Sequence, residues 1–229
     1  VLKDAGAAAI YGSRSSNGVV LITTRKGKLN ERPSVKLTSS VGWQTPHLLY
    51  EPVAGWRNAE MRNESYKNVG GYIEFTDEQI ADLRNHQSEE RWFMREIFRT
   101  ALQQNYNVSV SGGTDKATYM VSAGYFDQAS NYVGNKNYGT QRYNLRSNVE
   151  MQAGRLNLQA LLAFVREDNL ATTGTSLERD ASRVPPYYYY KMKANGKYLL
   201  NDILSEFNPL GSLEAGGTDK SRKNDFTAN

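Results

Sequence analysis

The stretch that decides the fold is QNYNVSVSGGTDKATYMVSAGYF, residues 104–126, in which two alternating segments flank a glycine-containing turn. Residues 104–111 and 116–126 both place apolar side chains on one parity and polar side chains on the other. Residues 112–115, Gly-Gly-Thr-Asp, supply the small and turn-forming side chains that a tight connection needs. Because side chains alternate across a strand, the stretch predicts an antiparallel hairpin with one apolar and one polar face.

The same alternation recurs in residues 33–43, 142–152 and 155–167, which predicts five strands in all. The polar parity carries Lys36, Lys116, Arg142, Arg146, Glu150 and Arg155. Aromatic rings stand on the apolar parity near the ends of the strands, namely Trp43, Tyr106, Tyr125, Tyr143 and Phe164. A soluble sheet also keeps charges off its buried face, but aromatic belts at both ends of an apolar band are typical of a membrane-spanning β-barrel.

The connections between these strands alternate in length. The long segments 44–103 and 168–223 and the medium segment 127–141 are separated by the short turns 112–115 and 153–154. Bacterial barrels have short turns at one end and long loops at the other, whereas β-sandwiches show no such alternation. We therefore predict an all-β fold with helical insertions in its loops. Helices are expected at 55–69 and 76–85, the second with Thr76 as N-cap and Gln79 completing a capping box.

Composition excludes several other classes of protein. The net charge of the 229 residues is +4, and residues 1–32 alone hold six basic and two acidic residues, so the rest of the chain is neutral. A nucleic-acid-binding face is therefore not expected. Cysteine is absent, which excludes disulfides and thiolate metal sites. No run of 18 apolar residues is present, and His47 and His86 are expected in loops rather than as ligands.

No catalytic constellation, metal site or cofactor site is predicted. The paired carboxylates Glu89-Glu90 and Glu167-Asp168 are adjacent in sequence, so they do not converge on one glycosidic bond as a hydrolase requires. Residues 12–18 lack the Gly-Lys-Ser/Thr of a phosphate-binding loop and precede a strand instead of a helix. We expect solvated charges and a structural turn at these places, and a protein that is not an enzyme.

Residues 1–27, VLKDAGAAAIYGSRSSNGVVLITTRKG, resemble the end of the plug domain in TonB-dependent outer-membrane receptors. The similarity is strongest to the SusC/RagA family of the Bacteroidetes. The plug motif consists of Tyr11, Gly12, Arg14, Asn17 and Gly18. Residues 105–116, followed by Tyr119 and Gly124-Tyr125, resemble the early barrel strands of the same family, and 55–68 resembles its first long loop.

The resemblance implies a fold, an activity and partners. Residues 1–32 would be the C-terminal end of the plug domain and its linker, and 33–229 the first strands and extracellular loops of an incomplete barrel of about 22 strands. The implied activity is TonB-dependent import of oligosaccharides across the bacterial outer membrane, as the barrel subunit of a SusCD-like complex. The implied partners are TonB, bound through a segment preceding Val1, a SusD-like surface lipoprotein, and outer-membrane lipid. The alternatives are a RagA-like peptide importer and a soluble β-rich carbohydrate-binding surface domain, whose apolar parity would be a packed core.

The same resemblance orients the chain and assigns candidate sites. The three long segments would be extracellular, the two short turns periplasmic, and the polar parity would face the lumen, with Arg142, Asn144, Arg146, Asn148 and Glu150 lining it. Substrate contact is predicted at aromatic residues of the loops, because their flat rings stack on sugars. These residues are Tyr187, Tyr188, Tyr189, Tyr190 and Trp56. Packing within the loop, an interface or contact with the lipoprotein cap is the alternative for the four tyrosines, and burial in a helical context is the alternative for Trp56.

Overall fold

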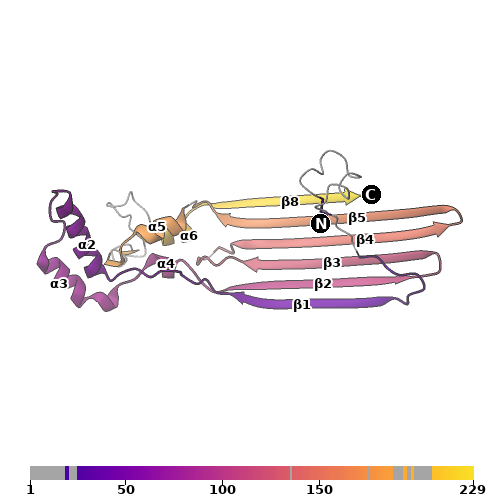
Figure 1. Ribbon diagram of the computed structural model, residues 1–229, viewed down its shortest axis with the longest axis horizontal. Helices are drawn as coiled ribbons and strands as arrows, with labels where there is room; N and C mark the ends of the chain where they lie inside the picture. Colours follow the sequence, from indigo (N-terminus) through magenta and orange to yellow (C-terminus); the bar gives the residue numbers. More distant parts are fainter. Residues whose placement is uncertain are drawn as a thin grey trace.

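The computed structural model describes residues 19–20, 25–134, 136–174, 176–187, 193–194, 197–198 and 208–229. Within these ranges six strands form one antiparallel sheet in the order β1-β2-β3-β4-β5-β8 (Figure 1). The strands are β1 (Ser34–Gln44), β2 (Ala101–Gly113), β3 (Ala117–Ala129), β4 (Gly139–Ala153), β5 (Leu156–Thr172) and β8 (Thr218–Ala228). The helices gather at one end of this elongated sheet and the short turns lie at the other (Figure 1).

The five predicted strands are confirmed, and β3, β4 and β5 extend several residues into segments that were expected to be loops. The prediction was wrong for Thr218–Ala228, most of which was assigned to a loop and which forms β8. This strand holds five charged residues among eleven, and only Phe226 and Ala228 are apolar on its outer parity. Its alternation is therefore too weak to predict a strand.

The expected alternation of connection lengths is confirmed. Residues 114–116 and 154–155 are the short turns, and the longer connections are 45–100, 130–138 and 173–217. The first turn was expected to include Gly112 and Gly113, but both belong to β2. Gly154 has a φ of +62°, a left-handed conformation that favours glycine. The predicted helices are present as α2 (Gly55–Asn68) and α3 (Asp77–Asn85).

Thr76 caps α3 as predicted. Its Oγ1 accepts a hydrogen bond from the Gln79 backbone N–H at 3.3 Å, and the Thr76 N–H donates to Gln79 Oε1 at 2.9 Å. Across the described ranges, no helix combines the length and the apolar character that crossing a membrane would require.

Shorter elements complete the loops at the helical end of the sheet. They are η3 (Gln87–Glu89), α4 (Phe93–Glu96), α5 (Leu177–Arg183), β6 (Lys193–Ala194), β7 (Lys197–Tyr198) and α6 (Pro209–Glu214). The main hydrophobic cluster of the described chain lies here, not in the sheet. It consists of Trp92, Phe93, Met94, Ile97, Tyr138, Leu177, Ala181, Val184 and Leu213. The three longer connections, 45–100, 130–138 and 173–217, thus share one core. We call these three connections together the loop platform.

The sheet itself has no such core in the part of the chain that the structure describes. Leu37, Leu145 and Leu158 on the apolar parity are 74%, 51% and 52% exposed. A soluble β-rich domain would bury these side chains beneath a second layer. Among the described residues, the sheet lacks the packed core expected under that alternative.

Candidate functional site

The apolar face of the sheet forms a band whose loop-side edge is aromatic. Tyr106, Tyr125 and Tyr143 lie directly opposite one another across β2, β3 and β4. Trp43 on β1 lies four residues further toward the loops, and Phe164 on β5 lies two residues toward the turns. All five rings therefore follow one edge of the band. The expectation of rings from this set at both ends of the band was wrong.

The two outer rings of the aromatic edge are displaced along the strands in opposite directions, although its three tyrosines share one hydrogen-bonded row. From Trp43 to Phe164 it shifts by six residues, about 20 Å along the strands, across four strand spacings of about 4.8 Å each. This corresponds to a strand tilt of roughly 45°, close to the 35–45° of membrane barrels. The apolar stretches Tyr143–Met151 and Leu156–Phe164 each span eight residue steps. Eight steps rise about 19 Å at that tilt, so with its end side chains the band approaches the roughly 25 Å of a bilayer-facing belt.

The polar residues predicted on β4 share the opposite face of the sheet. In the register of β3 and β4, Arg146 lies opposite Ser122, Asn148 opposite Met120, and Glu150 opposite Thr118. The structure thus confirms that Arg142, Asn144, Arg146, Asn148 and Glu150 share one side of the strand. It also separates them, because Arg142, Asn144 and Arg146 are exposed whereas Asn148 is only 3% exposed.

Residues 25–31 cover the turn-side part of this polar face and then lead into β1 (Figure 1). Lys26 forms an ion pair with Glu150. The Asn148 Nδ2 donates a hydrogen bond to the Arg25 carbonyl oxygen at 3.3 Å, while its Oδ1 is buried without a hydrogen-bond partner among the described residues. The sequence indicated only a basic turn at these residues, so their docking on the sheet was missed.

Gly27 is the residue that permits this close approach. A Cβ at Gly27 would lie 2.5 Å from the carbonyl oxygens of Gly112 and Tyr119, which is too short for any real contact. Beyond it, the Asn30 N–H donates to the Thr114 carbonyl oxygen, and the Gly113 N–H donates to that of Glu31, both at 2.9 Å. The segment is therefore held by backbone contacts against the β2–β3 turn.

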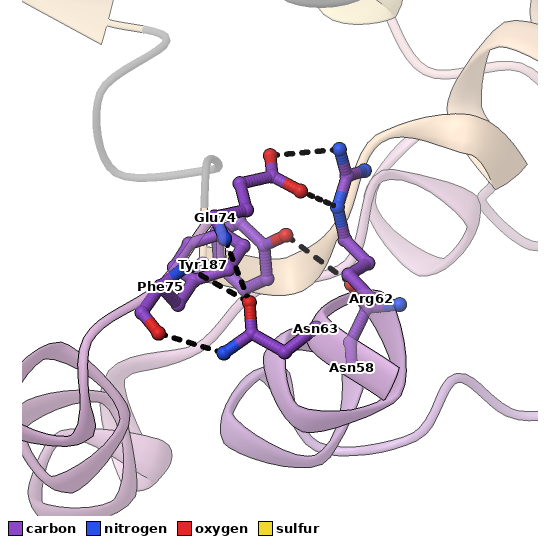
Figure 2. A network of polar contacts seen from close by, with 6 residues as sticks. All are labelled: Asn58, Arg62, Asn63, Glu74, Phe75 and Tyr187. Carbon is purple, nitrogen blue, oxygen red and sulfur yellow. Dashed lines mark hydrogen bonds and ion pairs between the residues drawn. The ribbon is translucent and has the colours of Figure 1, made fainter. Parts of the chain in front are cut away.

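In the loop platform, Asn63 organises the connection between α2 and α3 (Figure 2). Its Oδ1 accepts hydrogen bonds from the N–H groups of Glu74 at 3.0 Å and Phe75 at 2.9 Å, and its Nδ2 donates to the Phe75 carbonyl oxygen at 2.6 Å. Next to it, Arg62 forms a bidentate ion pair with Glu74, with both contacts at 2.8 Å. These contacts give a loop of polar residues a defined shape.

Tyr187 packs against this network. Its side chain is 4% exposed, its hydroxyl donates to Asn58 Oδ1 at 3.2 Å, and its ring meets Phe75 edge-on at 5.5 Å (Figure 2). This placement corresponds to the packing alternative for Tyr187. Tyr188, Tyr189 and Tyr190 lie outside the residues that the structure describes, as do the plug-motif residues Tyr11, Gly12, Arg14, Asn17 and Gly18.

Trp56 lies on α2 at the surface of the same platform. Its Nε1 donates to Gln87 Oε1 at 3.0 Å, and the Arg84 guanidinium lies 4.3 Å from the centre of its ring. The ring is half-buried, with a cation over one of its faces. Contact of this ring with a substrate stays a prediction.

Glu90, expected as a solvated charge, instead caps α2. The Gly55 N–H at the start of this helix donates to both Glu90 carboxylate oxygens, at 2.9 and 3.0 Å. The N-cap residue Ala54 has no side chain that can do this. Burial raises the pKa of the Glu90 carboxyl, and the hydrogen bond from Gly55 opposes that rise.

These features define a class of protein. A tilted antiparallel sheet with an apolar outer band, an aromatic edge and a polar inner face belongs to the barrel-type fold of outer-membrane proteins. No family model matches the chain. It is, however, 32% identical over its whole length to the TonB-dependent receptor SusC of Bacteroides thetaiotaomicron, of which it covers 24%. It is 27% identical over its whole length to the TonB-dependent receptor P3 of Formosa agariphila, of which it covers 22%.

Solved structures agree with these relatives. A structure of the RagAB peptide importer in the open-open state aligns with 74% of this chain and 21% of its own, at a TM-score of 0.57 and 25% identity. A structure of the RagAB peptide transporter aligns with 73% and 21%, at a TM-score of 0.59 and 25% identity. The chain is thus similar along its whole length to SusC and, over about three quarters of its length, to the RagAB transporter. It spans about a quarter of the length of the curated relatives that it matches end to end.

Proposed function

We propose that this chain forms the first strands of the wall of a TonB-dependent transporter, which imports oligosaccharides across a bacterial outer membrane. The slanted apolar band with its aromatic edge carries this proposal, because it fits a wall that faces lipid on one side and an aqueous lumen on the other. The similarity to SusC over the whole chain supports the same assignment. The work of such a protein is binding and passage, so the proposal includes no catalytic step.

The proposed division of the chain places the end of the plug domain and its linker at residues 1–32, and barrel strands with extracellular loops at 33–229. The docking of residues 25–31 on the polar face supports this division, because a linker from an internal plug must reach β1 along the lumen side. The loop platform then lies outside the cell and the turns 114–116 and 154–155 lie in the periplasm.

The proposed partners are those that the resemblance to SusC and RagA implies. TonB would act through an N-terminal segment, a SusD-like surface lipoprotein would cap the loop platform, and lipid would surround the apolar band. Candidate substrate contacts are the exposed part of the polar face, with Arg142, Asn144 and Arg146, and the aromatic residues Trp56, Tyr188, Tyr189 and Tyr190 of the loops. Asn148 and Glu150 would instead hold the linker.

The linker contact is suited to reversible release. Lys26 and Glu150 are 42% and 33% exposed, and ion pairs of that kind contribute at most about 1 kcal/mol. A pull on the plug from the periplasm would therefore work mainly against the backbone hydrogen bonds of Asn30 and Glu31 to the β2–β3 turn, and detaching residues 25–31 would open part of the lumen wall.

Peptide import is the second candidate. The similarity to the RagAB peptide importer and transporter favours it, because these structures align with 74% and 73% of this chain. The residues of the exposed polar face, two arginines and an asparagine, can bind either sugar hydroxyls or peptide carboxylates.

Growth distinguishes the two candidates. The full-length gene would be deleted from its native bacterium, and growth compared on an oligosaccharide mixture and on a peptide mixture as the limiting nutrient. Loss of growth on oligosaccharides alone, restored by the wild-type gene, supports the proposal. Loss on peptides alone supports the second candidate, and unimpaired growth with unchanged uptake of both labelled mixtures contradicts import.

A further inference from the structure

The outer face of the sheet changes character just beyond the aromatic edge. Asp168 on β5 accepts a hydrogen bond from Arg166 Nε at 2.8 Å and from Arg222 Nε of β8 at 2.5 Å. These residues, with Lys220 and Arg99, line a hollow of about 640 Å³. We call this set of side chains the outer basic cluster.

All members of the cluster on β5 and β8 point to the lipid side, not to the lumen. Arg166 lies two residues beyond Phe164, and Arg222 lies four residues beyond Phe226, on the parity that carries the apolar band. In the register, Arg166 pairs with Asn224, Asp168 with Arg222, and Leu170 with Lys220. The alternation that keeps charges off the apolar parity therefore ends at Arg166.

Depth places these cations among lipid headgroups. At about 3.4 Å per residue and a tilt of roughly 45°, Arg166 lies about 5 Å and Arg222 about 10 Å above the last apolar ring of its strand. The headgroup region adds about 5–8 Å on each side of the hydrocarbon core. The cations thus lie at or slightly above the level at which a lipid presents its phosphate.

The cluster carries an excess of positive charge. Four cations line the hollow, Arg99, Arg166, Lys220 and Arg222, against two acids, Asp127 and Asp168. Asp168 holds the guanidiniums of Arg166 and Arg222 side by side. Their N–H groups are thereby ordered as hydrogen-bond donors to a phosphate. In an aqueous setting such a group would need no ligand, but beside an apolar band its nearest anions are lipid phosphates.

We propose that the outer basic cluster binds the phosphate-bearing headgroup of a lipid in the outer leaflet. The proposal rests on the membrane orientation given above and adds a binding site on the outside of the wall, separate from the lumen that would conduct substrate. The lipid would anchor its headgroup in the hollow while its chains lie along the apolar band beneath Phe164 and Phe226.

The test uses the full-length protein in detergent, after heat-modifiable migration on gels has shown that wild type and variants form the barrel. Diphosphoryl lipid A is titrated in, and bound lipid is counted by native mass spectrometry. The variants are Lys220→Gln and Arg222→Gln. Lys223→Gln is the matched control, because Lys223 is on the same exposed strand but on the polar face, opposite Glu167.

Lys220→Gln and Arg222→Gln should each weaken lipid binding about fivefold, since each cation near a membrane surface contributes about 1 kcal/mol, and Lys223→Gln should leave it unchanged. Dephosphorylated lipid A should bind poorly. Equal binding to all variants would overturn the proposal, as would inorganic phosphate competing as strongly as the lipid, which would indicate a site for a free anion. Because transport is scored separately by growth, loss of this site and loss of the proposed function give different results.

Discussion

An arginine placed on one face of β5 and, in a second variant, on the other face tests the lipid-facing assignment directly. Ala160 lies midway along the apolar stretch Leu156–Phe164, close to the middle of the band, and Gln159 beside it lies on the polar face opposite Glu150. Both residues are exposed, so an arginine fits at either position without displacing a packed neighbour. We expect Ala160→Arg to prevent assembly and Gln159→Arg to be tolerated.

The expected difference is large enough to measure. An arginine at the middle of the lipid-facing surface costs about 2–4 kcal/mol, which is roughly a 30-fold to 900-fold change in an equilibrium constant. At Gln159 the cost should stay within about 0.5 kcal/mol, because the side chain remains in water on the polar face. The two variants have the same substitution at adjacent positions, so backbone propensity and added bulk are matched.

The assay is the amount of heat-modifiable full-length protein in the outer-membrane fraction, together with the folded fraction after dilution from urea into lipid vesicles. Ala160→Arg should lower both by at least tenfold relative to Gln159→Arg. Equal tolerance of both variants would refute the lipid-facing assignment, and so would greater damage from Gln159→Arg.

Three further predictions concern the linker and the loop platform. Gly27→Ala should lift residues 25–31 from the sheet, because its Cβ would lie 2.5 Å from two carbonyl oxygens. Gly42→Ala is the control, because a Cβ at Gly42 has nothing within 4 Å. The yield of a carbodiimide cross-link between Lys26 and Glu150 should fall only in the Gly27→Ala variant. Asn63→Ala should leave the Glu74 and Phe75 N–H groups without their acceptor, at a cost of about 1–3 kcal/mol. Amide exchange at Glu74 and Phe75 should then be at least about fivefold faster, and unchanged exchange would contradict the prediction. Glu64→Ala is the control, because Glu64 is exposed on the same helix. The pKa of His86 is raised above its ordinary 6.5, mainly by its hydrogen bond to the Asp82 carbonyl. This contact should therefore stabilise the end of α3 below pH 6.5, and the stabilisation should be lost as the pH rises through the raised pKa. Amide exchange at residues 83–86 should lose this pH dependence in His86→Gln, and identical pH profiles of the variant and the wild type would argue against the contact.

The loop platform shows how far neighbouring sequence can be trusted. The capping box at Thr76 was predictable because both of its partners lie within three residues of each other. The cap that Glu90 provides for α2 was not, since Gly55 and Glu90 are 35 positions apart and no local pattern links them. For the same reason Tyr187 could be predicted either as a surface ring or as a packed one, and only its contacts with Asn58 and Phe75 decided the matter.

What the sequence determined by itself is the set of properties that depend on side-chain period and local turn chemistry. The alternation of Tyr106, Val108 and Val110 with polar residues predicted β2 and its two faces, and the spacing of turns predicted which connections are short. β8 was not predicted because both faces of the sheet carry polar residues beyond the aromatic edge. Lys220 and Arg222 therefore alternate with other polar or charged residues, not with apolar ones.

Only the tertiary structure decided the properties that depend on register between distant strands. The line from Trp43 to Phe164, the tilt that it measures, and the placement of Arg166, Asp168 and Arg222 above it all come from pairing between strands. So does the burial of Asn148 beneath residues 25–31, more than a hundred positions earlier. The free energy of strand pairing is spread over whole strands, and pairing also requires the closure of loops of very different lengths. No single stretch of the sequence therefore determines the register.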